Sequence, residues 1–201
     1  MQLLLVRHAE PVRIVDADGP ADPPLHERGF RQAAELARHL ADERLDAVWS
    51  SPLQRARQTA APLGEAHGLE VMIDEELAEW DRAATSYIPV EELKATKDER
   101  WVAMTEGRLE DYSVDPLEFQ AAVVAAMDRV IAAHPGQTVA VVCHGGVINA
   151  YVGKILGIRR PLWFEPVYAS IHRVTASRTG VRSLFTLNEH AHVRDHLGQP
   201  A

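Results

Sequence analysis

The chain alternates between short apolar runs and longer stretches in which apolar residues recur at helical spacing. The short runs favour buried strands at residues 3–6, 45–49, 70–73 and 138–143. The helical spacing predicts helices at residues 27–42, 53–67, 116–133 and 147–156. Two later runs, residues 169–175 and 181–187, flank a Thr-Gly turn and indicate an antiparallel pair of strands. This order predicts a three-layer α/β fold, with a mostly parallel central sheet and helices on both of its faces.

The middle of the chain breaks this regularity. From residue 75 to about residue 115 the sequence is acidic and only weakly periodic, with one helix expected near residues 90–104. Four aromatic residues are scattered through it, at Trp80, Tyr87, Trp101 and Tyr112. For the first three, a place in the lining of a lid and a place in the core are both open. The stretch is too short for a core of its own. We therefore expect a single domain, residues 1–201, in which residues 80–115 form a lid insertion over the sheet edge.

Composition narrows the classes of partner. The formal net charge is −8, which excludes a general surface for nucleic acid or an anionic membrane, so any anion site must be a local pocket. The chain has one cysteine and hence no intrachain disulfide. It shows neither a signal-peptide pattern nor an apolar run of membrane-spanning length, so we expect a cytoplasmic protein. The sequence leaves a homodimer open.

The candidate chemistry gathers where the strands end. Arg7 and His8 follow the first strand directly, and His144 follows the strand at 138–143. Because parallel strands end at the same edge of a sheet, we expect the two histidines to face each other. Arg55 lies one turn into the helix after another strand, and two glycines after His144 let backbone N–H groups approach an anion. These residues predict a phosphate pocket that contains a histidine nucleophile.

At this point the sequence resembles a known family. The motifs that carry the resemblance are Arg7-His8-Ala9, residues 24–33, residues 51–60 and His144-Gly145-Gly146, in that order. Together they are similar to the histidine phosphatase superfamily, with its phosphoglycerate-mutase-like fold. The resemblance spans nearly the whole chain, from residue 3 to residue 192.

The resemblance implies roles for individual residues. His8 is the nucleophile that takes the phosphoryl group. Arg7, Arg55 and His144 bind the non-bridging oxygens, and Gly145 joins them in substrate binding. The expected activity is hydrolysis of a small phosphomonoester, without a metal ion or other cofactor.

The general acid is the least certain assignment. The family carries a carboxyl group just after the third strand, and Glu79 fits that position best. Glu75, Glu76 and Asp81 remain competitors for the role. The reaction requires such a group because a leaving alkoxide needs a proton.

The sequence departs from the family in ways that leave alternatives open. Ala9 stands where the family usually has glycine, Pro11 stands where many members have Ser or Thr, and the usual motif after the acid is absent. The substrate therefore cannot be named. A phosphoglycerate-type phosphomutase and a non-catalytic scaffold of the same fold are the alternatives to a phosphatase.

Two other features have simpler interpretations. Cys143 precedes His144, but successive strand residues point to opposite faces, so we expect a buried, apolar cysteine rather than a nucleophile. The histidines at 190, 192 and 196 lack partners at metal-ligand spacing, and we expect a polar tail with His192 near the pocket rim.

Overall fold

The computed structural model describes residues 1–108 and 114–197. Within these residues a six-stranded sheet has the order β3-β2-β4-β1-β5-β6. The strands are β1 (Gln2–Arg7), β2 (Ala47–Ser50), β3 (Val71–Ile73), β4 (Thr138–Cys143), β5 (Ile171–Ala176) and β6 (Arg182–Glu189). The first four strands in the spatial order are parallel, whereas β5 and β6 form the antiparallel pair at the other edge.

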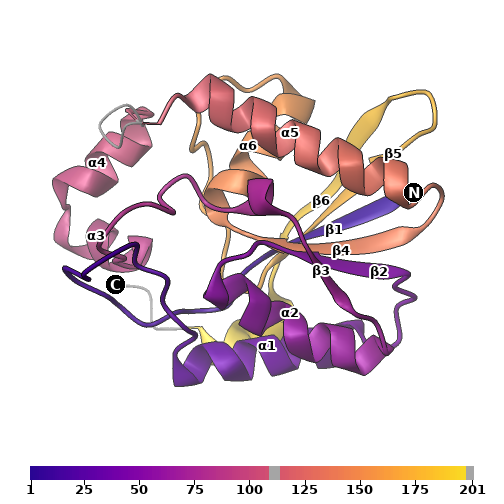
Figure 1. Ribbon diagram of the computed structural model, residues 1–201, viewed down its shortest axis with the longest axis horizontal. Helices are drawn as coiled ribbons and strands as arrows, with labels where there is room; N and C mark the ends of the chain where they lie inside the picture. Colours follow the sequence, from indigo (N-terminus) through magenta and orange to yellow (C-terminus); the bar gives the residue numbers. More distant parts are fainter. Residues whose placement is uncertain (109–113, 198–201) are drawn as a thin grey trace.

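Helices cover both faces of the sheet, which confirms the three-layer α/β fold (Figure 1). α1 (Glu27–Leu40) and α2 (Gln54–His67) lie on one face, and α5 (Pro116–Ala133) and α6 (Gly145–Leu156) lie on the other. The alternation of side chains along β1 serves both layers. Leu4 packs into the α1–α2 core, while Leu3 and Leu5 pack into the α5–α6 core. Across residues 1–108 and 114–197, no helix has both the length and the apolar content needed to cross a membrane.

The pairing of β1 with β4 sets the level at which both strands end. Arg7 is in register with Cys143, and the backbone N–H of His8 donates to the Cys143 carbonyl at 2.9 Å. β1 therefore extends one residue past the apolar residues 3–6, because β4 is still available to pair with Arg7. Cys143 is fully buried in the α5–α6 core, as expected, and burial raises the pKa of its thiol.

The expected single helix at 90–104 is wrong: this stretch forms α3 (Val90–Thr96) and α4 (Glu99–Glu106). Lys97 separates them because its backbone is left-handed, with φ of 53°, and its N–H closes α3. Asp98 then caps α4 by accepting the N–H of Arg100 at 3.0 Å. Both helices lie beyond the edge where the parallel strands end (Figure 1). Tyr112 lies outside the described residues.

The loop between β1 and α1 pairs with the chain that precedes α3. Ile14 and Tyr87 exchange two backbone hydrogen bonds, of 3.0 and 2.9 Å, and Ala17 donates to Thr85 at 2.9 Å. This pairing satisfies backbone groups in two stretches without regular structure. It also holds the segment before α3 against the loop that follows β1.

The histidine-rich tail packs on α1 through a 3₁₀-helix, η3 (Ala191–His196). His192 stacks on His39 with ring centroids 4.6 Å apart and contacts the Ala169 carbonyl at 3.0 Å. His196 lies 3.5 Å from Glu35. The expectation that His192 lies near the pocket rim is therefore wrong. His192 contacts α1 instead, because the tail packs along that helix.

Candidate active site

The strand ends bring the two histidines together. The rings of His8 and His144 lie with their centroids 5.0 Å apart, tilted by 57°. Both side chains are almost completely buried. The parallel register of β1 and β4 accounts for this placement, because His8 and His144 each follow the last residue of a paired strand.

The surroundings of His8 select one tautomer. Its Nδ1 lies 2.8 Å from the carbonyl oxygen of Ala9, which can only accept, so Nδ1 carries the proton and Nε2 keeps a lone pair. Burial lowers the pKa of His8 well below 6.5, and the positive charges of Arg55 and Arg7 lower it further. His8 is therefore a neutral imidazole at ordinary pH, which is the form that acts as a nucleophile.

Arg7 is held by three groups from distant parts of the chain. Its Nη1 donates to the carbonyl of Pro166 and lies 3.1 Å from Oε1 of Glu91, on α3. Its guanidinium stacks 3.8 Å from the ring centroid of Tyr168, whose hydroxyl also donates to Glu91 at 2.8 Å. The guanidinium is thus fixed in orientation before any ligand binds.

Arg55 lies in the first turn of α2 and is 1% exposed. Its guanidinium stacks 4.7 Å from the ring centroid of Tyr87. The nearest carboxylates, of Asp22 and Asp81, lie 3.8 and 3.7 Å away, beyond hydrogen-bond distance. Arg55 thus keeps its charge without a close carboxylate, and together with Arg7 it makes a local cationic pocket inside an acidic protein.

Three buried nitrogens in this region have no hydrogen-bond partner among the described residues: Nε of Arg7, Nε of Arg55 and Nδ1 of His144. Nε2 of His144 lies 2.7 Å from the hydroxyl of Ser51. That hydroxyl also accepts the N–H of Leu53 and can donate its own proton to Nε2, in which case His144 carries its proton on Nδ1. Unpaired buried donors are costly, and a bound anion that accepts from them lowers that cost.

Glu79 is attached to the first turn of α6. The backbone N–H of Gly146 donates to its Oε2 at 2.8 Å, and the N–H of Trp80 donates to its Oε1 at 3.1 Å. Burial raises the pKa of Glu79 to about 7, and the negative charge of Asp81 acts in the same direction, while the two N–H groups oppose the shift. The carboxyl group therefore exchanges its proton near neutral pH.

Gly146 makes this contact possible. A Cβ on Gly146 would lie 2.1 Å from Oε1 of Glu79 and 2.6 Å from Cδ1 of Trp80. A Cβ on Gly145 would meet only the ring of Pro166, at 3.9 Å. Sequence reasoning expected the glycines to admit a ligand anion, but the anion that meets the Gly146 N–H is the carboxylate of Glu79.

The competing carboxylates are placed differently. Glu75 and Glu76 are exposed on a short 3₁₀-helix, η1 (Glu75–Leu77), and neither lines the cavity that contains His8. Asp81 does line that cavity and faces Arg55, and burial raises its pKa. Glu79 differs from Asp81 in being fixed by two backbone N–H groups beside His144.

The site contains a cavity of about 210 Å³, and His144 is not among the residues that line it. Its walls include His8, both arginines and Glu79, together with Tyr87 and Trp101 from the segment that precedes and forms α3 and α4. In residues 1–108 and 114–197, no three His, Cys, Asp or Glu side chains are grouped so that they would hold a metal ion. The geometry is that of an anion pocket with a neutral imidazole on one side and a protonatable carboxyl group on another.

Substitution of Gly146 by Ala tests the support of Glu79. The added methyl group displaces the carboxyl group, so we expect turnover of an alkyl phosphate to fall by roughly 10²-fold. Gly145→Ala has room for its methyl group and should lose far less. Steady-state kinetics and thermal unfolding of both variants measure the difference, and equal losses would contradict the assigned contact.

Substitution of Arg55 by Lys tests the geometry of the anion pocket. An ammonium keeps the charge but lacks the planar fork, so we expect kcat to fall by roughly 10²–10³-fold and inhibition by vanadate to weaken. Arg57, which is exposed on the same helix, is the matched control, and Arg57→Lys should behave like the wild type. If the Arg57 variant is the more sensitive one, the pocket has been placed on the wrong face of α2.

Comparison with known proteins gives matches over most of the chain. A model of the histidine phosphatase superfamily, branch 1, matches residues 3–189. Phosphoserine phosphatase 1 of Hydrogenobacter thermophilus is 36% identical over 172 residues, which cover 79% of this chain and 77% of that protein. The probable phosphoglycerate mutase GpmB of Yersinia pestis is 29% identical over 167 residues, with 79% and 76% covered.

Solved structures share the fold. A phosphoserine phosphatase from Entamoeba histolytica superposes with a TM-score of 0.75 at 22% identity, over 96% of this chain and 98% of that one. A mycobacterial glucosyl-3-phosphoglycerate phosphatase has a TM-score of 0.73 at 22% identity, over 94% and 99%. The match of the family model over residues 3–189 and the 36% identical relative show that the chain belongs to branch 1 of the histidine phosphatase superfamily.

Proposed function

We propose that the protein hydrolyses phosphomonoesters through a phosphohistidine intermediate on His8, with Glu79 as general acid and base. The observation that carries the proposal is the neutral His8, with Nε2 unprotonated, beside three buried donors that lack partners. A phosphoryl group would supply acceptors for these three nitrogens, which belong to Arg7, Arg55 and His144. The two arginines balance the charge of a phosphate dianion.

The first half-reaction transfers the phosphoryl group. Nε2 of His8 attacks phosphorus and forms the N–P bond as the bond to the leaving oxygen breaks. Glu79 gives its proton to that oxygen, so the alcohol leaves neutral and Glu79 becomes a carboxylate. Arg7, Arg55 and His144 stabilise the charge on the equatorial oxygens of the flattened phosphoryl group.

The second half-reaction restores the enzyme. The Glu79 carboxylate takes a proton from a water molecule, whose oxygen attacks phosphorus and displaces Nε2. Phosphate leaves, and His8 and Glu79 return to their starting protonation states. A pKa near 7 suits Glu79 to both steps, because the group must be protonated in one and ionised in the other. No metal ion or cofactor takes part in this mechanism.

The names of the relatives support hydrolysis and keep one alternative open. A phosphoserine phosphatase is the 36% identical relative, while a probable phosphoglycerate mutase is 29% identical. A mutase shares the first half-reaction and returns the phosphoryl group to a second alcohol instead of water. We favour hydrolysis because the acidic stretch at 80–115 lacks the basic pattern expected of a mutase lid. The complete set of His8, Arg7, Arg55 and His144 argues against a non-catalytic scaffold.

The test of the intermediate is substitution of His8 by Ala. We expect the variant to lose phosphatase activity and to keep the thermal unfolding temperature of the wild type. After a rapid quench, the wild-type peptide that contains residue 8 should carry an alkali-stable, acid-labile phosphoryl group, and the variant peptide should lack it. Phosphoserine, 3-phosphoglycerate and 4-nitrophenyl phosphate are suitable substrates for the assay. A folded His8→Ala protein that keeps most of its activity would refute the mechanism.

The role of Glu79 is tested by Glu79→Gln and by the pH dependence of a single turnover. Alkyl phosphates need a proton on the leaving oxygen, so their transfer to His8 should slow as pH rises through about 7, where Glu79 ionises. The rate should hold well below pH 6.5 because the pKa of His8 is lowered. Glu79→Gln should abolish the fall in rate near pH 7, and it should slow turnover of alkyl phosphates far more than turnover of 4-nitrophenyl phosphate. Equal impairment of both substrates would indicate a structural role.

A further inference from the structure

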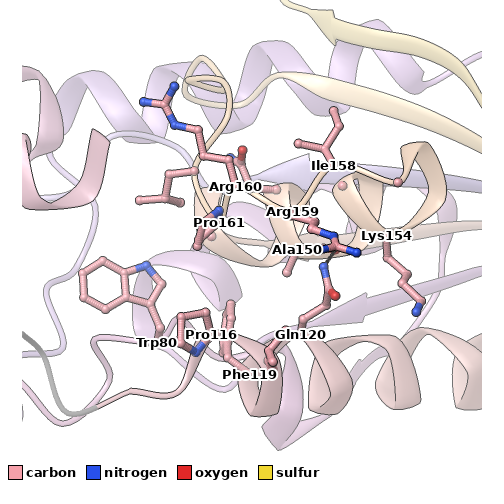
Figure 2. Close-up of a pocket in the computed structure, with 16 residues that line it drawn as sticks. Trp80, Pro116, Phe119, Gln120, Ala150, Lys154, Ile158, Arg159, Arg160 and Pro161 are labelled. Carbon is pink, nitrogen blue, oxygen red and sulfur yellow. Dashed lines mark hydrogen bonds between the residues drawn. The ribbon is translucent and has the colours of Figure 1, made fainter. Parts of the chain in front are cut away.

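A second cavity, of about 690 Å³, adjoins the one that contains His8. It lies between the start of α5, the length of α6 and the loop that follows α6 (Figure 2). The two cavities share part of their walls, at Trp80, Gly146, Asn149, Arg160 and Leu162. Its volume is within the range of small-molecule sites, roughly 300–1,000 Å³. The mechanism above makes no use of it.

The walls of the second cavity combine apolar surface with positive charge. Trp80 and Phe119 lie toward one end in Figure 2, and Lys154 and Arg159 lie toward the other. Among the described residues, neither Lys154 nor Arg159 has an ion pair, and none of the residues that line the cavity is acidic. This is notable in a chain with 29 acidic and 21 basic residues. The chemistry of the walls suits a ligand with an apolar body and an anionic end.

The position of Glu79 indicates where such a ligand comes from. A general acid must contact the leaving oxygen, so the alcohol part of a substrate extends from the point where Glu79 meets it. Glu79 is bound by the N–H groups of Trp80 and Gly146, and both residues also line the second cavity. A leaving group that extends from Glu79 along Trp80 would thus reach the second cavity.

Resting on the function proposed above, we propose that the second cavity binds the alcohol part of the substrate. The substrate class is a phosphomonoester of an elongated, largely apolar alcohol whose far end is anionic. Trp80 and Phe119 contact the apolar body, and Arg159 and Lys154 bind the terminal anion. This substrate is longer than a short phosphorylated acid, which the smaller cavity around His8 accommodates by itself.

The experiment compares two matched series of phosphomonoesters. One series consists of ω-carboxyalkyl phosphates of increasing chain length, and the other of alkyl phosphates of the same lengths, which lack the carboxylate. The measured quantity is the ratio of kcat/KM between the two members of each length. 4-Nitrophenyl phosphate measures the catalytic centre of each variant separately. Arg159→Glu is the test variant, and Arg178→Glu, which makes the same charge change on an exposed turn, is the control.

We expect the wild type to prefer the carboxylate by roughly tenfold once the chain is long enough to reach Arg159, as for one charge-assisted hydrogen bond. Arg159→Glu should reverse the preference, Lys154→Glu should reduce it, and Arg178→Glu should keep it. Provided that 4-nitrophenyl phosphate is still hydrolysed, either of two results overturns the inference. One is a wild type with no preference for the carboxylate at any chain length, and the other is an Arg159→Glu variant that retains the wild-type preference. Failure to hydrolyse any phosphomonoester overturns the proposed function instead.

Discussion

The parallel pairing of β1 with β4 is the constraint on which the rest of the site depends. Both strands are buried on both faces, and their side chains alternate between an α1–α2 core and an α5–α6 core. A slip of one residue would exchange the cores into which Leu3, Leu4 and Leu5 pack, and it would shift Arg7 away from its position opposite Cys143. The same register places His8 level with His144. The apolar cores therefore determine the geometry of the polar site, although none of their side chains belongs to it.

Charge burial is the second feature that organises the pocket. Arg7 and Arg55 are at most 5% exposed, yet Arg55 has no carboxylate within hydrogen-bond distance. Aromatic rings of Tyr168 and Tyr87 cover the two guanidinium groups and orient them. Such an arrangement is costly while the pocket lacks an anion and becomes favourable once an anion binds, which is the electrostatic preorganisation expected of a site for phosphoryl transfer.

Much of the fold and the placement of the strand-end residues could be predicted from sequence because local patterns determine them. The apolar runs located β1 and β4, and the residues after each run located His8 and His144. The break at Lys97 was missed because a left-handed lysine has no local signal of the kind that glycine provides. The contacts of Ser51 with His144 and of Gly146 with Glu79 were missed because they join residues 93 and 67 positions apart. Only tertiary structure specifies such pairs.

The contact between Arg7 and Glu91 links the pocket to α3. Nη1 of Arg7 already donates to Pro166 and contacts Glu91, so it has no further proton for an arriving ligand. An anion that binds through Nη1 must displace either the Pro166 carbonyl or Glu91, whereas one that binds through Nε leaves both in place. Where Glu91 is displaced, ligand affinity and the docking of α3 share one coupling free energy, and each weakens the other by the same factor. The nitrogen of Arg7 that a phosphate contacts thus decides whether substrate binding competes with the contact between Arg7 and α3 or is independent of it.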